Sequence, residues 1–160
     1  MQKVTLSDTH LILTAANNAE RAALLLFSIA SAVYPGDNEN LINYSIREAI
    51  EAGITLGLNA RKVIELCHLG QVHFTQTRWR YDFDPRARET SFRNATDRFV
   101  LAKQLKVRTL RHPQQIFRND IVITEFIITT DRKEPAYIDV FGFACAYLSQ
   151  IAPQIAPQTT

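Results

Sequence analysis

The chain has 160 residues, of which 46% are hydrophobic and 21% charged, and its formal net charge is +2 at pH 7. This length suits one domain with one core, and the composition excludes a disordered, collagen-like or low-complexity chain. We predict a single globular domain over residues 1–152 and a flexible tail over residues 153–160, which are rich in Pro, Gln and Thr.

The N-terminal half of the sequence predicts a helical hairpin. Ser7 and Asp8 are suitable N-cap residues, and apolar residues recur at helical spacing until Pro35–Gly36 ends the first helix. The polar residues 37–40 supply another cap, and a second helix with isoleucines four residues apart follows over Leu41–Leu69. Two consecutive helices with a short link form a hairpin.

Small residues mark one stripe of the second predicted helix. Ala49, Gly53 and Gly57 lie four residues apart, although each glycine costs about 1 kcal/mol of helix propensity relative to alanine. Their presence indicates that a neighbouring backbone approaches this stripe closely. Two interpretations stay open at Gly57: the helix continues through it, or it ends there and Asn59 caps a new helix.

The middle of the chain predicts a strand followed by a third helix. Arg78–Phe83 alternates between charged and aromatic residues, which is the period of a β-strand. Asp84–Pro85 places an N-cap residue before a first-turn proline and so predicts a helix from there to about Lys106. Phe92 and Phe99 belong to the apolar stripe of this helix.

The C-terminal third predicts two paired strands. Ile121–Thr130 is rich in β-branched residues, and Ala136–Val140 follows after a polar link, which indicates an antiparallel hairpin. Phe141–Ile151 either extends the second strand or forms a short helix, and its apolar spacing favours the helix. The predicted fold class is therefore α+β: an N-terminal helical hairpin, a third helix, and a small antiparallel β-hairpin in the C-terminal third.

Basic residues are concentrated in the middle of the chain. The segment Arg78–Arg118 contains eleven basic and four acidic residues, whereas the segments on either side of it are net negative. Arginine pairs with phosphate in a planar fork, and aromatic faces stack on exposed bases. The candidates for binding nucleic acid or another anion are Arg78, Trp79, Arg80, Arg86, Arg93 and Arg98. In the alternative interpretation, the aromatic residues face the core and the arginines form a solvated face paired with acids.

A second candidate site lies in the second predicted helix. Arg61 and His68 enclose six residues, and this spacing resembles the Arg-x(4–6)-His motif of HEPN domains. The leading helical hairpin is also similar to that family, and Arg93–Asn94 resembles the start of the same motif. HEPN domains are helical, and many are metal-independent ribonucleases that act as dimers. The resemblance implies that Arg61 and His68 are catalytic and that the chain cleaves RNA as a homodimer.

The chemistry of this pair suits a ribonuclease. Histidine has a pKa near 6.5 and can act as a general acid or base, and arginine can stabilise a pentacoordinate phosphate. Seven positions apart on a helix, Arg61 and His68 share a face about 10 Å apart, so they reach one phosphate across a dimer or through side-chain bending. The alternative is a surface arginine and a half-buried histidine.

Other chemistry finds little support in the sequence. Cys67, His68 and His73 lack a fourth ligand at a recognised spacing, so we predict no metal and no cofactor. Cys67 and Cys145 are predicted to be buried thiols. We expect a cytoplasmic protein that does not engage the membrane, because the sequence shows neither a secretory signal nor an apolar run of about 20 residues.

Three functional hypotheses follow. The favoured one is a non-catalytic binding or assembly module whose basic central segment engages a polyanion such as nucleic acid, or an acidic protein partner. The second is a HEPN-like metal-independent ribonuclease. The third is a structural or small-ligand-binding domain that forms a homo-oligomer, for example a homodimer, through the small-residue stripe. The first is favoured because it requires only the charge distribution.

Overall fold

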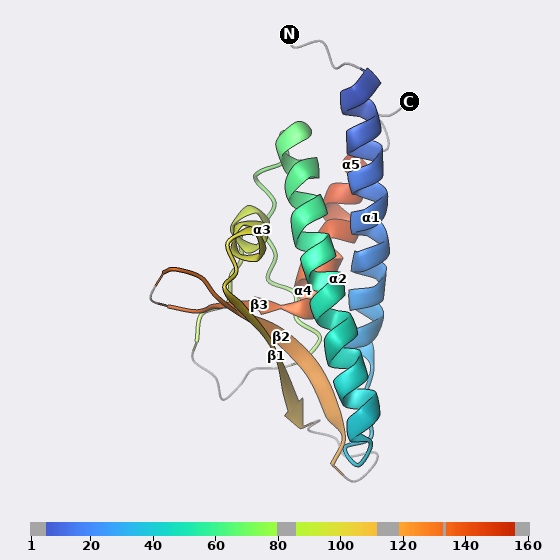
Figure 1. Ribbon diagram of the computed structural model, residues 1–160, viewed down its shortest axis with the longest axis vertical. Helices are drawn as coiled ribbons and strands as arrows, with labels where there is room; N and C mark the ends of the chain where they lie inside the picture. The colour runs from blue at the N-terminus through green and yellow to red at the C-terminus, as the bar shows by residue number, and fades with distance from the viewer. Residues whose placement is uncertain (1–5, 80–85, 112–118, 133, 156–160) are drawn as a thin grey trace.

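The N-terminal half of the molecule is the predicted helical hairpin. The computed structural model describes residues 6–79, 86–111, 119–132 and 134–155. Helix α1 spans Leu6–Ser31 and helix α2 spans Glu39–Leu66, and the two run side by side along the long axis (Figure 1). Asn38 caps α2, because its side chain accepts a hydrogen bond from the Leu41 N–H at 3.1 Å. Helix α2 continues through Gly57, so the predicted alternative of a break there is wrong.

The rest of the described chain contains a short helix, a sheet and a C-terminal helical segment. This segment includes one π-helical turn, at Tyr147–Ile151. The other elements, in chain order, are α3 (Phe92–Val100), β1 (Gln104–Arg111), β2 (Ile121–Thr129), β3 (Ala136–Asp139), α4 (Val140–Ala146) and α5 (Ala152–Ile155). The α+β fold class is confirmed, and the predicted β-hairpin is formed by β2 and β3.

The sheet is antiparallel with the order β1-β2-β3, so β1 is an edge strand. Arg108 pairs with Glu125, and Thr109 pairs with Ile123, which leaves Thr124 as the extra residue of a β-bulge. The Thr124 hydroxyl donates a hydrogen bond to the Arg108 carbonyl at 3.2 Å. The bulge therefore fixes the register at the point where Arg108 faces Glu125.

Three predictions about the elements after residue 77 are wrong. The third helix does not run from Pro85 to Lys106: residues 86–90 are not helical, α3 covers only Phe92–Val100, and Gln104–Arg111 is strand. Residues 78–79 are not in a strand, and the rest of the strand predicted over Arg78–Phe83 lies outside the described residues. Residues 153–155, predicted to begin a flexible tail, belong to α5, and Ile155 is buried.

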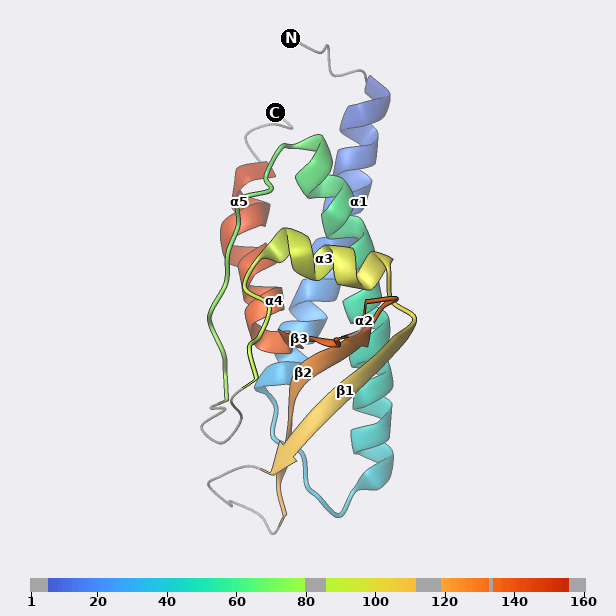
Figure 2. The ribbon, with the colours of Figure 1, turned by 90° about the vertical axis from the view of Figure 1, so that its left-hand side faces the viewer.

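The molecule is built as a helical layer covered on one side by the sheet and α3. The C-terminal helical segment packs along α1, and the Tyr147 hydroxyl donates a hydrogen bond to the Ala16 carbonyl at 3.1 Å. Figures 1 and 2 show the sheet and α3 on the same side of these helices. The core lies between the two layers and contains the fully buried side chains of Leu26, Leu56, Phe126 and Phe143. Within the described ranges, no helix has the length and apolar character needed to cross a membrane.

Aromatic rings fill the space beneath α3. The Phe92 and Phe99 rings stack on Phe143 with centroids 4.9 and 5.3 Å apart, and Phe92 and Phe99 are only 1% and 5% exposed. Both aromatic residues therefore face the core, as the alternative interpretation of the basic segment proposed. They are not available to stack on nucleic-acid bases.

The small-residue stripe of α2 receives rings from the same chain. A Cβ atom at Gly53 would lie 2.6 Å from Phe126 Cζ, and one at Gly57 would lie 2.6 Å from Phe99 Cβ. The close neighbour is thus not another backbone but two phenylalanine side chains, one from β2 and one from α3. Because the stripe is occupied from within the chain, it does not offer the surface through which we predicted a homo-oligomer, and the homodimer itself stays a prediction.

Replacing Gly57 by alanine tests this packing. The added methyl group gains about 1 kcal/mol of helix propensity but collides with Phe99, and overpacking of this kind costs about 1–3 kcal/mol. The closest atom is the Phe99 Cβ, which cannot rotate away, so the cost should lie in the upper part of this range. We therefore expect the free energy of unfolding of Gly57→Ala, measured by urea denaturation, to fall by about 1–2 kcal/mol. The control is Thr55→Ala at an exposed position of α2. Equal or greater stability of Gly57→Ala would show that Phe99 does not occupy the stripe.

Candidate anion-binding surface

A buried carboxylate organises part of the basic segment. The Glu125 side chain on β2 is fully buried, although Phe126 beside it points toward α2, so Glu125 lies on the opposite face of the sheet. Three arginines surround it: Arg86 Nη2 and Arg108 Nη1 lie 3.0 and 3.1 Å from Oε1, and Arg88 Nε lies 3.1 Å from Oε2. A buried carboxylate requires such partners, because desolvation costs several kcal/mol per ion.

The fold brings these arginines together from separate parts of the chain. Arg108 arrives through the β1–β2 register. Arg86 and Arg88 arrive because the segment before α3 follows β3, where the Glu89 N–H donates to the Tyr137 carbonyl at 2.8 Å. The Arg86 guanidinium carbon lies 4.0 Å from the centroid of the Tyr137 ring, a cation–π contact that holds Arg86 over β3.

The predicted anion-binding residues do not gather on one face. Arg86 belongs to the Glu125 cluster, whereas Arg93 and Arg98 lie on α3. Trp79 lies beside the end of α1, where its indole N–H donates to the Ala30 carbonyl at 2.9 Å. Arg78 stacks over the Trp79 ring at 5.3 Å from its centroid. Arg80 lies outside the described residues.

A second group of basic residues follows α3 and β1. We call it the basic strip, and it consists of Arg93, Arg98, Lys103, Lys106 and Arg111. Its two strand residues lie on opposite faces of β1, Lys106 on the face of Arg108 and Arg111 on the other. Arg98 is half-buried and the other four are exposed. Within the described part of the chain, none of the five forms an ion pair. The strip therefore groups the cations between Phe92 and Arg111 that have no ion pair with another described residue.

The acidic residue nearest the strip is paired with an arginine of α2. Asp97 is the single acidic residue between Phe92 and Arg111, and its Oδ1 lies 2.7 Å from Arg61 Nη1. Arg61 Nε also lies 2.7 Å from Glu65 Oε1. Arg61, which the HEPN resemblance assigns to catalysis, thus ties α2 to α3 in this structure.

His68 occupies a specialised backbone position just after α2. Its φ angle of 55° is left-handed, and the following Leu69 N–H donates to the Ile64 carbonyl at 2.9 Å. This hydrogen bond is typical of helix ends closed by a left-handed residue, a position that glycine usually occupies. The imidazole is exposed. A catalytic role for Arg61 and His68 stays a prediction.

Neither cysteine is placed for nucleophilic chemistry. Cys67 is buried, as predicted, and Cys145 is half-buried rather than buried. Burial raises the pKa of the Cys67 thiol, and burial together with the Asp139 charge raises the pKa of Cys145. A raised pKa disfavours the reactive thiolate at neutral pH. Among the residues that the structure describes, no group of three or more His, Cys, Asp and Glu side chains could hold a metal ion.

Sequence reasoning missed the partners that matter most at these sites. Glu125 is the one charged residue of Ile121–Thr129, and a lone acid in an apolar strand was the available signal. Its arginines stand 17 to 39 residues away in the chain, so only the fold identifies them.

Comparison of this chain with protein-family models, curated proteins and solved structures finds no match.

Replacing Glu125 by glutamine tests the buried cluster. The substitution keeps the shape of the side chain but removes the charge that faces three guanidinium groups, and breaking a buried ion pair costs about 3–5 kcal/mol. We expect a loss of this size in urea denaturation of Glu125→Gln. Glu134→Gln, at an exposed position, is the control and should leave stability unchanged. A Glu125→Gln variant as stable as the wild type would refute the cluster.

Replacing His68 by glycine separates the role of its left-handed backbone at the end of α2 from a catalytic role of its imidazole. A left-handed backbone costs a non-glycine residue about 1–2 kcal/mol, and part of this is offset by the greater entropy that glycine loses on folding. We therefore expect His68→Gly to raise the free energy of unfolding by up to about 1 kcal/mol, measured by urea denaturation. If the wild type cleaves RNA in chelator and folded His68→Gly does not, the histidine is catalytic.

Proposed function

We propose that this chain is a non-catalytic binding module whose basic strip engages the phosphate backbone of a nucleic acid. One observation carries the proposal: the segment Phe92–Arg111 contains six basic residues and one acidic residue, and that acid, Asp97, is already paired with Arg61. Only Arg108 of the six is held by Glu125. The other five cations, on α3, β1 and the turn between them, form no ion pair within the described residues and can attract a polyanion.

Protection of the sheet edge does not account for the whole strip. Lysine on an edge strand prevents pairing with other chains, and this explains Lys106 on β1. It does not explain Arg93 and Arg98, because they lie on α3. Binding of a polyanion accounts for the residues on both elements.

The strip would contact the phosphates of a nucleic acid rather than its bases. Phe92 and Phe99 are buried, and the Trp79 ring is half-buried and anchored to α1. The exposed groups are guanidinium and ammonium groups, which pair with phosphate oxygens without reading sequence. Binding should therefore depend steeply on salt and weakly on sequence.

The test measures binding of labelled single-stranded RNA and duplex DNA by fluorescence anisotropy at several salt concentrations. If the strip contacts five phosphates, the slope of log K against log salt is about −3.5 to −4.5. We expect the triple variant Lys103→Gln, Lys106→Gln, Arg111→Gln to bind at least about tenfold more weakly and to reduce the magnitude of this slope by about 2 to 3.

The control has the same change in net charge at another surface. Arg21, Arg47 and Lys62 are exposed on α1 and α2, and Arg21→Gln, Arg47→Gln, Lys62→Gln should bind within about twofold of the wild type. Equal losses in the two triple variants would show that binding follows net charge and not the strip. Binding of polyglutamate in preference to both nucleic acids would identify an acidic protein as the partner instead.

A further inference from the structure

A small cavity lies between α3 and the turn that joins β2 to β3. Its volume is about 110 Å³, and it is lined by Asn94, Asp97, Arg98, Leu101 and Arg132. Figure 2 shows the C-terminal end of α3, the start of β1 and the β2–β3 turn close together, and the Lys103 N–H joins them by donating to the Thr129 carbonyl at 2.8 Å. The cavity therefore adjoins the basic strip.

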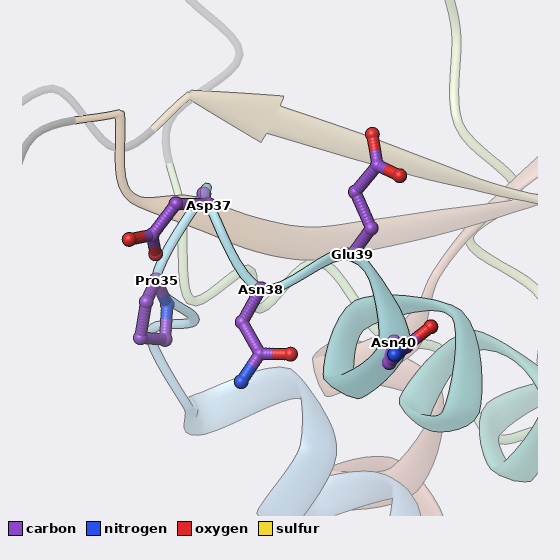
Figure 3. Close-up of a pocket in the computed structure, with 6 residues that line it drawn as sticks. Pro35, Asp37, Asn38, Glu39 and Asn40 are labelled. Carbon is purple, nitrogen blue, oxygen red and sulfur yellow. The ribbon is translucent and has the colours of Figure 1, made fainter.

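The charge of this cavity distinguishes it from two larger ones. The cavity of about 610 Å³ at the α1–α2 link is lined by Asp37 and Glu39 and by no basic residue (Figure 3). A cavity of about 300 Å³ between α1 and α2 has two glutamates and one arginine. Only the 110 Å³ cavity, of these three, is lined by more basic than acidic residues.

The one acid in the wall does not cancel the two arginines. Asp97 is paired with Arg61 at 2.7 Å, whereas Arg98 and Arg132 form no ion pair within the described residues. The cavity reaches the last turn of α3, where the helix carries about half a negative charge. The two guanidinium charges exceed the Asp97 charge and this half charge taken together, so the cavity is net positive and attracts an anion.

We propose that this cavity binds a terminal phosphate group, held by the Arg98 and Arg132 guanidiniums and the Asn94 amide. This inference rests on the proposed function, because the terminal phosphate is taken to belong to a nucleic-acid strand. Guanidinium groups match phosphate oxygens in a planar fork, and an amide N–H₂ donates to the same oxygens.

Size and charge select a terminal phosphate over the phosphates within a strand. A cavity of about 110 Å³ is well below the roughly 300 Å³ at which pockets hold drug-sized ligands, so a nucleoside does not enter it. A phosphate within a strand has substituents on two sides, whereas a terminal phosphate has one and enters end-on. It also carries a charge of about −1.5 to −2 at pH 7, which suits two arginines.

The test compares RNAs of identical sequence that end in a 5′-phosphate, a 3′-phosphate or hydroxyl groups only. For the wild type, we expect one terminal phosphate to tighten binding at least fivefold over the hydroxyl form. In Arg132→Gln this ratio should fall to about one while salt-sensitive binding through the strip persists, because Arg132 is not a strip residue. Arg98→Gln should lower this ratio too, and it should also weaken the binding of all three RNAs because Arg98 belongs to the strip. Arg132 is exposed in a turn, so its substitution leaves the fold intact.

Two controls separate this inference from the proposed function. Lys103→Gln removes a strip cation outside the cavity, so it should weaken the binding of all three RNAs alike and keep the fivefold ratio. Inorganic phosphate should raise the melting temperature of the wild type but not of Arg132→Gln; this result without any RNA binding would support the cavity and refute the nucleic-acid function. Equal binding of all three RNAs by the wild type would overturn the inference and leave the proposed function standing.

Discussion

The contact between Glu125 and its three arginines is the constraint on which the sheet side of the molecule depends. A carboxylate with no exposed surface is stable only with close positive partners. Arg108 satisfies this requirement only in the observed β1–β2 register, and Arg86 and Arg88 only when the segment before α3 lies along β3. The bulge at Thr124 and the position of α3 follow from the same arrangement, because α3 begins where that segment ends.

This contact also divides the basic residues by role. The strongly positive middle of the sequence is not one surface: part of it neutralises a buried acid, and part of it lies exposed along α3 and β1. Because Arg108 belongs to the buried group while its neighbours Lys106 and Arg111 do not, a count of charges along the chain cannot separate the two roles. Burial and ion pairing can separate them.

Local patterns predicted the helical hairpin but not the sheet side of the fold. Helical apolar spacing and the cap at Asn38 are local, and they gave α1 and α2 with small errors at the ends. The first three residues of β1, 104–106, fall within the predicted third helix, because Leu105 continues the apolar spacing of Phe92 and Phe99. What makes β1 a strand is pairing with β2, between residues such as Leu105 and Ile128 that are distant in the chain.

The candidate site, like the fold, was predicted only in part. The sequence located the basic segment, but it did not show which acidic residues its arginines pair with. Arg61 shows why. A motif of two residues at a set spacing identifies residue types, yet here the guanidinium group is engaged by Glu65 and Asp97. By pairing with Asp97, Arg61 offsets part of the one negative charge between Phe92 and Arg111, since Glu65 shares the same guanidinium group. An arginine of the helical hairpin thereby makes the electrostatic potential at the surface of α3 and β1 more positive.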